Sequence, residues 1–243
     1  MDWSSLSVKD IKNTEEYKKI PTSYKKSKCN KEQLINILNE LYNNNDNSND
    51  KLLSKTNKYP EGIEVKIIYD KTESNTIILK IKEETKDKLT QPIINVCGKE
   101  HKIPRYQGGF GDDGLKYSYS KITVNAEPWT PTLAKIRDKV QNITNLKFNF
   151  VLVNYYRDGN DYISYHADDE KVMGNNPIVS VSFGIGRDFL LKNNNTKEVT
   201  KIFLNSGDLL SMSYEINQKY KHSIPKRANV KDERFNLTFR TLV

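Results

Sequence analysis

The sequence predicts an α+β protein with a mainly β core, built as a jelly-roll barrel that carries helices on one side. Two observations carry this prediction. After a helical lead-in, the chain breaks into many short segments in which polar and apolar residues alternate, as they do in strands with one buried face. Turn-forming residues separate these segments, at Gly159, at residues 184–186 and at residues 206–208. Short strands divided by tight turns are typical of antiparallel β architectures.

Residues 1–62 are expected to form an N-terminal extension, and residues 63–243 the main domain. The extension contains one expected helix over residues 31–42, where Asn30 can cap the N-terminus and apolar residues recur at helical spacing. The run 43–50 is almost entirely polar and has nothing to bury, so we expect a loop there.

The main domain begins with an expected strand over residues 63–69, where every second residue is apolar or aromatic. A helix is expected over residues 73–88, although the run Ile77-Ile78-Leu79 fits a strand equally well. Another helix is expected to begin at Thr130, with Pro131 in its first turn and an apolar stripe behind it. The later expected strands cover residues 150–156, 178–183, 189–191, 201–204, 209–212 and 236–242.

The composition favours a protein that binds a polyanion. Its formal net charge is +8 and its pI is about 9.2, although most of the lysines are expected to be ordinary solvated surface. No apolar run is long enough to span a membrane, and the N-terminus lacks the pattern of a secretory signal. The two cysteines, Cys29 and Cys97, indicate neither a disulfide framework nor a structural zinc site. We therefore expect a protein of a reducing intracellular compartment, either the nucleus or the cytoplasm.

The candidate metal ligands are His166, Asp168 and His222. Side chains at positions i and i+2 of a strand project from the same face, so the first two can hold one ion while a later strand delivers His222. A His-x-Asp triplet also arises by chance, and a lone histidine is more often a structural residue than a ligand. Here, however, two of the chain's three histidines take part in the pattern. Two imidazoles and one carboxylate form the facial triad of non-haem Fe(II) oxygenases.

The run from Arg234 to Arg240 is a candidate anion site. Polar and apolar residues alternate along it, so one face of the strand is polar and basic while the other faces a core. A solvated sheet edge would show the same pattern. Two arginines in the same barrel as a metal site instead indicate donors for a dicarboxylate, because guanidinium groups match carboxylate oxygens bidentately. The polar residues are Arg234, Asn236, Thr238 and Arg240.

Five ordered blocks of residues in the second half of the chain resemble the AlkB family of Fe(II)- and 2-oxoglutarate-dependent nucleic-acid dealkylases. The similarity continues upstream through residues 98–105, 117–120 and 127–129, is closest to the animal DNA-repair members, and is expected to begin near Ile63. The five blocks are residues 154–159, 166–170, 177–184, 222–225 and 234–240.

The resemblance implies a double-stranded β-helix that uses Fe(II), 2-oxoglutarate and O2, with ascorbate as the reductant. The iron would be held by His166, Asp168 and His222. We expect Arg240 to pair with the distal carboxylate of 2-oxoglutarate, and Arg234 with the carboxylate nearer the iron. By the same resemblance, the full set of cosubstrate-binding residues is Asn154, Tyr156, Arg234, Asn236, Thr238 and Arg240.

The resemblance also implies a substrate: an N-methylated base of DNA, such as 1-methyladenine or 3-methylcytosine, whose methyl group leaves as formaldehyde alongside succinate and CO2. A base cannot reach a buried iron while it is stacked, so it must be flipped out or already single-stranded. Tyr119 is expected to stack on one face of the base and His166 to flank the other. Tyr117 and Glu170 are expected to hydrogen-bond its edge, and Asp169 to orient the loop. Ordinary strand packing of the two tyrosines remains an alternative.

Four further residues are expected near the nucleic acid: Cys97, Gly98, Lys99 and Arg105. In duplex-repairing members of the family, a bulky apolar residue fills the gap left by the flipped base, and Cys97 matches that position. A cysteine is too small to support the opposite stack, so we expect single strands or already unpaired lesions to be favoured. Lys99 and Arg105 are expected to follow the phosphates.

Two alternatives remain open at this point. One is an enzyme of the same fold that acts on RNA or on protein, and the other is a catalytically silent nucleic-acid-binding module. For the DNA dealkylase we expect a monomer that binds nucleic acid and does not associate with membranes.

Overall fold

The computed structural model describes residues 59–96, 98–119, 122–168 and 175–242, together with Ser7, Lys9 and Asp10. The chain separates into two compact units, Met1–Lys51 and Leu52–Val243. The expected helix over residues 31–42 and the loop over 43–50 lie outside the described residues. The expected domain boundary at residues 62 and 63 therefore stays a prediction.

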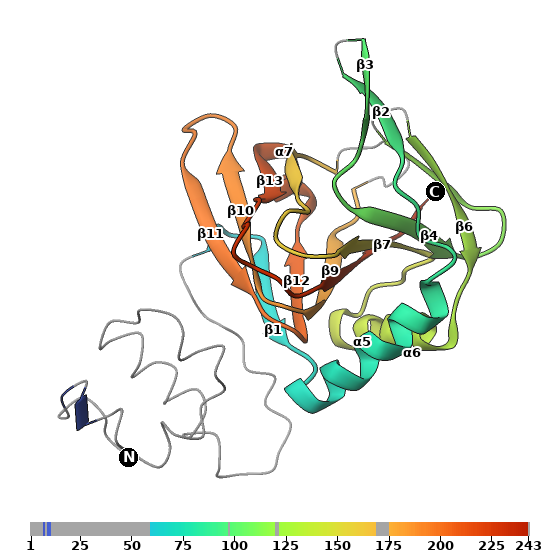
Figure 1. The fold of residues 1–243 in the computed structure, drawn as a ribbon, viewed down its shortest axis with the longest axis horizontal. Helices are drawn as coiled ribbons and strands as arrows, with labels where there is room; N and C mark the ends of the chain where they lie inside the picture. Colours follow the sequence, from blue (N-terminus) through green and yellow to red (C-terminus); the bar gives the residue numbers. More distant parts are fainter. Residues whose placement is uncertain are drawn as a thin grey trace. The chain divides into compact units, whose positions relative to one another are not determined.

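The second unit is built on two facing β-sheets (Figure 1). The smaller one contains, in order, β11 (Val199–Leu204), β10 (Arg187–Asn193), β13 (Tyr220–Ile224) and β8 (Ile163–His166). The larger one contains, in order, β1 (Ile63–Ile67), β12 (Asp208–Met212), β9 (Ile178–Gly184), β14 (Arg234–Arg240), β7 (Phe150–Tyr156), β4 (Tyr106–Gly111), β6 (Ile122–Pro128) and β5 (Lys116–Tyr119).

The path from β7 to β14 confirms the predicted jelly roll. The chain passes back and forth between the two sheets, so that β7, β9, β12 and β14 join the larger sheet while β8, β10, β11 and β13 form the smaller one. Strand pairs within this part are antiparallel; the pair β4 and β6 is parallel. This arrangement is the double-stranded β-helix, with a closed inner space between two sheets.

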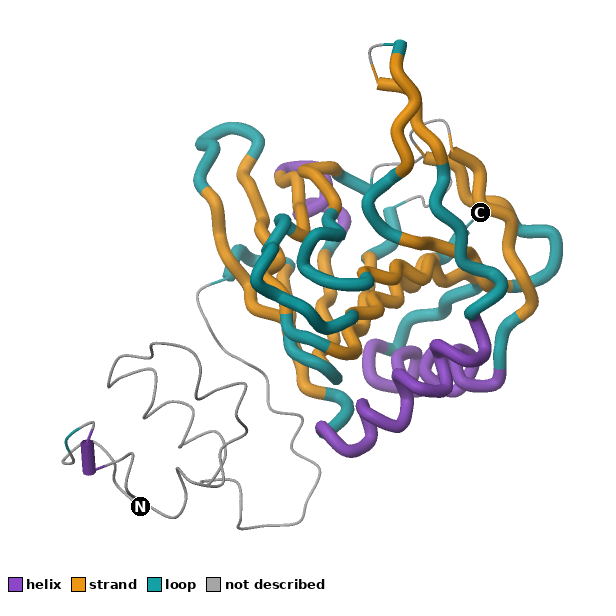
Figure 2. Tube along the Cα trace, viewed as in Figure 1, coloured by secondary structure: helices purple, strands orange, loops and turns teal. Residues whose placement is uncertain are grey.

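Two helices cover the outer face of the larger sheet (Figure 2). The helix α5 (Lys71–Thr85) begins with a capping box between Asp70 and Glu73, which resolves the helix-or-strand alternative for this segment in favour of a helix. The helix α6 (Pro131–Thr144) begins after Thr130, whose side chain caps it, and has Pro131 in its first turn, as predicted. It ends at Asn145, which adopts the left-handed conformation at φ 54°.

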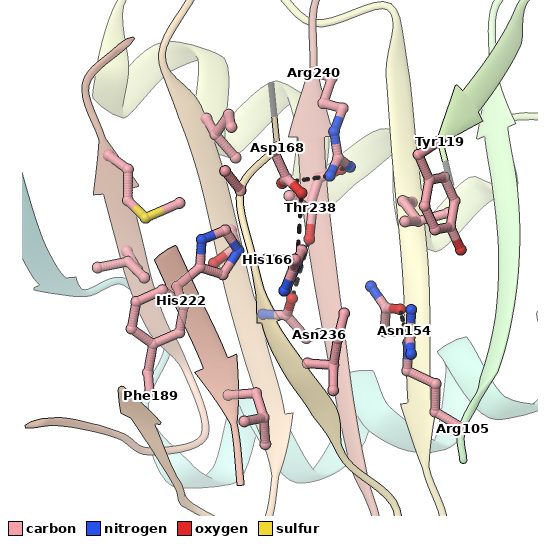
Figure 3. A pocket seen from close by; sticks show the side chains of 18 of the residues that line it. Arg105, Tyr119, Asn154, His166, Asp168, Phe189, His222, Asn236, Thr238 and Arg240 are labelled. Atoms are coloured by element: carbon pink, nitrogen blue, oxygen red, sulfur yellow. Dashed lines mark hydrogen bonds and ion pairs between the residues drawn. The ribbon is translucent and has the colours of Figure 1, made fainter. Parts of the chain in front are cut away.

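The central strand β14 shows how the alternation of the sequence organises the fold. Its apolar residues Phe235, Leu237 and Phe239 are buried in the core shared with the helices. The intervening polar residues face the other way, into the space between the sheets (Figure 3). That space is closed by a second core, which includes Phe189, Leu191, Ile202 and Leu210. One face of β14 therefore stabilises the fold while the other is available for chemistry.

A third, two-stranded sheet projects from this body as a hairpin (Figure 1). It consists of β2 (Ile93–Val96) and β3 (Lys99–Lys102), and all four residues of β3 are exposed. A bridge between Thr90 and Gln107 ties the base of the hairpin to the larger sheet. None of the described helices combines the length and apolar character that a membrane span requires.

Candidate active site

The three predicted metal ligands come together in the part of the chain that the structure describes. The ligand atoms of His166, Asp168 and His222 all lie within 4.8 Å of one another. His166 ends β8 and lies opposite His222 in the register of β13, and their ring centroids are 4.2 Å apart. Asp168 follows two residues after His166, and its Oδ1 lies 3.6 Å from Nε2 of His166 (Figure 3).

Neighbouring groups orient each ligand. Nδ1 of His166 lies 2.9 Å from the carbonyl oxygen of Ser164, so this nitrogen carries the proton and Nε2 is left to bind a metal. The ring of Phe189 stacks on His222 at a centroid distance of 5.2 Å. Arg240 donates a hydrogen bond of 2.6 Å from Nη2 to Oδ2 of Asp168.

The electrostatics of the site favour the protonation states that metal binding needs. Burial opposes ionisation of Asp168, but the charge of Arg240 and the two imidazoles outweigh it and lower the pKa of Asp168 to about 2. Burial, together with the adjacent His166, lowers the pKa of His222 to about 3. At neutral pH the site therefore offers a carboxylate and a neutral imidazole, both ready to coordinate.

The donor set fits Fe(II). Two imidazole nitrogens and one carboxylate oxygen lie within 4.8 Å of one another, and all three residues line the inner space of the barrel. This leaves open the positions that a chelating keto acid and O2 require in facial-triad enzymes. The residues present are therefore suited to hold the metal.

The predicted cosubstrate residues all line the same cavity as the metal cluster. Arg234 lies opposite Tyr156 in the register of β7 and β14, and Asn236 lies opposite Asn154. Thr238 donates a hydrogen bond of 3.1 Å to Oδ1 of Asn236. The residues from β7 and β14 that line the cavity are Leu152, Asn154, Tyr156, Arg234, Asn236, Thr238 and Arg240.

The two arginines lie at different distances from the metal ligands. Arg240, which we expected at the distal carboxylate of 2-oxoglutarate, lies against the metal ligand Asp168. Arg234 lies six residues away on the same face of β14, about 20 Å along the strand. The alternation of β14 shows which face the arginines share but not which end of the strand meets β8, so the carboxylate that each arginine contacts stays a prediction.

Arg234 is a buried cation with incomplete hydrogen bonding. It is 1% exposed, and burial lowers its pKa to about 10. Its Nη2 donates to Oγ of Ser182 at 2.8 Å and its Nη1 approaches the carbonyl of Leu204 at 3.5 Å. Its Nε has no hydrogen-bond partner among the described residues. A buried guanidinium with an unsatisfied donor is a suitable partner for a carboxylate.

The predicted base-contacting tyrosines lie side by side on β5. Tyr117 is 1% exposed and packs between Phe150 and the guanidinium of Arg240, whose carbon lies 4.5 Å from the ring centroid. Tyr119 stacks on Tyr117 at 5.4 Å, is half-buried, and lines the cavity. Both tyrosines line the cavity, but ordinary strand packing accounts for much of the burial of Tyr117, and Tyr119 is the more exposed of the two.

Arg105, which we expected to follow the phosphates, lines the cavity. It is 5% exposed, and its Nε donates to Oδ1 of Asn154 at 2.9 Å (Figure 3). Its Nη2 also approaches Oε1 of Gln107 at 3.5 Å, and the hydroxyl of Tyr119 donates to the same oxygen. The guanidinium therefore joins Asn154 to Gln107 and, through Gln107, to Tyr119, and a contact between Arg105 and the phosphates stays a prediction.

The remaining predicted substrate residues lie away from the cavity or outside the described residues. Gly98 and Lys99 are exposed on the β2–β3 hairpin, where Gly98 adopts a φ of 79°. Cys97, Asp169 and Glu170 belong to the undescribed segments.

Three site residues were not predicted from the sequence: Ser182, Gln107 and Asn217. Ser182 could have been predicted, because Ser180 and Ser182 alternate with valine in β9, and this alternation indicates that the two serines face the cavity side. Gln107 lies in a glycine-rich strand that lacked a strand pattern. Asn217 lies in the short helix α7 (Tyr214–Lys219), and nothing in its sequence indicates that it contacts Asp168.

The comparisons with known proteins agree with this geometry. The sequence model of the 2OG-Fe(II) oxygenase superfamily matches residues 65–240. The "DNA oxidative demethylase ALKBH2" of Bos taurus is 38% identical over 188 residues, which cover 73% of this chain and 67% of the relative. The human protein of the same name is also 38% identical, over 73% of this chain and 72% of its own length.

Two further matches cover a smaller part of the chain or concern the fold alone. The human "Alpha-ketoglutarate-dependent dioxygenase alkB homolog 3" is 35% identical over 57% of this chain and 52% of its own length. The solved structure of OsALKBH1 has the same fold, with a TM-score of 0.54 at 18% identity over 74% of this chain and 96% of that one. This chain is therefore an Fe(II)- and 2-oxoglutarate-dependent dioxygenase and belongs to the AlkB family of that superfamily.

Proposed function

We propose that this protein removes methyl groups from N-methylated bases of DNA, such as 1-methyladenine and 3-methylcytosine, and so repairs alkylation damage. The observation that carries the proposal is one cavity that contains a facial triad, a buried arginine for a dicarboxylate and an aromatic ring for a base. The names of the ALKBH2 relatives, which are DNA oxidative demethylases, support the same substrate class.

The cosubstrate would be held at the Arg234 end of β14, the end away from Asp168. Arg234 is the residue that we assign to the distal carboxylate of 2-oxoglutarate, with Tyr156 beside it across the strand pair. Arg240 instead fixes the carboxylate of Asp168. Asn154, Asn236 and Thr238 complete the polar wall between the two arginines.

The chain's own residues would bind, orient and shield the reactants. Fe(II) bound with 2-oxoglutarate and O2 supplies the oxidation that hydroxylates the N-methyl group, after which the hydroxymethyl adduct collapses to formaldehyde and the repaired base. The buried wall formed by Phe189, Ile178 and Leu210 excludes water from this space. His166 and Tyr119 both line the cavity and would flank a base that has left its stack.

The β2–β3 hairpin is the part of the molecule best placed to meet the rest of the nucleic acid. Lys99 and Lys102 are exposed on it and can contact phosphates. Cys97 falls between the two strands in the sequence, and a small side chain there would give little support to the strand opposite a flipped base. We therefore propose that single-stranded DNA, or a lesion that is already unpaired, is preferred over an intact duplex.

The proposal also covers the domain boundaries, the oligomeric state, the cellular location and the reductant. We propose that residues 63–243 form the catalytic domain and residues 1–62 an extension to it. The enzyme would act as a monomer in the nucleus or cytoplasm, where a reductant such as ascorbate keeps the iron in the Fe(II) state.

The test is demethylation of one oligonucleotide sequence that contains 3-methylcytosine, presented as single-stranded DNA, duplex DNA and RNA. Mass spectrometry measures loss of the methyl group in the presence of Fe(II), ascorbate and 2-oxoglutarate, with Asp168→Ala as the control. The proposal predicts repair of DNA, faster on the single strand, and none by the variant. Repair of RNA alone would replace DNA with RNA as the substrate, and repair of neither would overturn the proposal.

A further inference from the structure

Asp168 is held by its backbone as well as by its carboxylate. Its peptide N–H donates to Oδ1 of Asn217 at 3.1 Å, and Nδ2 of Asn217 donates to the carbonyl oxygen of Asp168. Asn217 is 5% exposed and belongs to α7, which directly precedes the strand that carries His222. A single side chain therefore satisfies both polar groups of the backbone of a metal ligand.

This contact takes the place of strand pairing. In the register of β8 and β13, His166 lies opposite His222, but β8 ends at His166 and Asp168 lies beyond it. A primary amide carries one donor side and one acceptor side, as a peptide group does, so Asn217 reproduces the pairing that a neighbouring strand would have given. The backbone of Asp168 is thereby fixed although it lies past the end of the sheet.

The contact between Asn217 and Asp168 also links two of the metal ligands through a short piece of chain. The helix α7 begins at Ser213, whose side chain accepts from the N–H of Ile216, and it ends where β13 begins. Asn217 and His222 are thus held by one capped and buried segment. Any shift of α7 would therefore move Asn217, with the backbone of Asp168 that it binds, together with the strand that carries His222.

We propose that Asn217 is a positioning residue of the metal centre: it sets the place of Asp168 relative to His222, so that the triad exists in its coordinating arrangement before the metal arrives. The inference rests on the metal-binding role of the triad in the function proposed above. Groups that orient metal ligands typically contribute 10- to 100-fold to metal affinity. Asn217→Ala should therefore weaken metal binding by about tenfold or more.

The test is a titration of the full-length, metal-free protein with Co(II) alone, followed by its visible absorption. Co(II) accepts the same nitrogen and oxygen ligands as Fe(II) and reports its coordination through its ligand-field bands. We expect Asn217→Ala to bind Co(II) at least tenfold more weakly than the wild type, with a saturated spectrum shifted toward that of Asp168→Ala. A merely structural role would lower the folded fraction without changing the spectrum of the folded protein.

Asn149→Ala is the matched control. Asn149 makes the same pair of bonds to the backbone of one residue, because its Nδ2 donates to the carbonyl oxygen of Leu242 at 2.8 Å and its Oδ1 accepts from the N–H of Leu242 at 2.8 Å, but it does not line the cavity. Asn149→Ala should leave Co(II) affinity and spectrum unchanged. Should Asn217→Ala fail to fold, Asn217→Leu decides, because it keeps most of the side-chain volume, adds no charge and loses both hydrogen bonds to the backbone of Asp168. It should bind Co(II) more weakly than the wild type.

Each outcome is decisive. Wild-type affinity and spectrum in the folded Asn217 variants would overturn the positioning role while leaving the proposed function intact. Equal Co(II) binding by the wild type and Asp168→Ala would overturn the metal site itself, and this inference with it.

Discussion

The ion pair between Arg240 and Asp168 gives a sharp test of how the site is built. Nη2 of Arg240 lies 2.6 Å from Oδ2 of Asp168, and the two side chains are 3% and 10% exposed. Arg240→Met removes the charge and keeps much of the volume. Removing one partner of a buried pair costs about 3–5 kcal/mol, because the other charge is left uncompensated. We therefore expect Arg240→Met to lower the free energy of unfolding by about 3–5 kcal/mol.

The assay is urea denaturation of the metal-free protein, with Arg227→Met as the matched control. Arg227 pairs with Asp188 at 2.7 Å, but its side chain is 44% exposed. Breaking such a pair costs about 0–1 kcal/mol, because water and salt screen it. The reasoning would be refuted if Arg240→Met lost no more free energy of unfolding than Arg227→Met.

The other predictions concern binding. Arg234→Gln should raise the KM for 2-oxoglutarate by roughly 10- to 100-fold, because a charge-assisted hydrogen bond is worth about 1.5–3 kcal/mol; an unchanged KM would remove Arg234 from the cosubstrate site. Tyr119→Phe keeps the ring and loses only the bond to Gln107, so its KM for a methylated oligonucleotide should stay within about threefold of the wild type, whereas Tyr119→Ala should raise it about tenfold or more. Equal effects of these two variants would contradict stacking. Cys97→Phe should increase the ratio of duplex to single-strand activity, and a constant ratio would show that this position does not control the choice.

Much of the fold could be predicted from the sequence because the pattern of β14 is so regular. The alternation from Arg234 to Arg240 assigns Phe235 and its apolar partners to one core and the polar residues to the cavity, and the structure confirms this. The metal triad could also be predicted from the sequence, because His166 and Asp168 are two residues apart, which is the spacing of side chains on one face of an extended segment.

Other elements could not be predicted for physical reasons. The strand β4 contains three glycines, which have low strand propensity. At Gly109 a Cβ would lie 2.7 Å from the ring of Phe150, so the glycine is required by packing that the sequence does not show. The helix α7 is only six residues long, too short for a helical period to emerge. The ends of β14 were ambiguous as well, because the alternation does not show which of the two arginines lies beside the metal ligands.

The most direct test of the central claim is the ratio of products formed from single-stranded DNA that contains 3-methylcytosine. Succinate and formaldehyde are measured in the same reaction, with the wild type and with Asp168→Ala. If the triad and the base pocket belong to one catalytic site, the wild type should release the two products in equal amounts and the variant neither. Succinate without formaldehyde would contradict a base demethylase, and formaldehyde from Asp168→Ala would contradict the metal site.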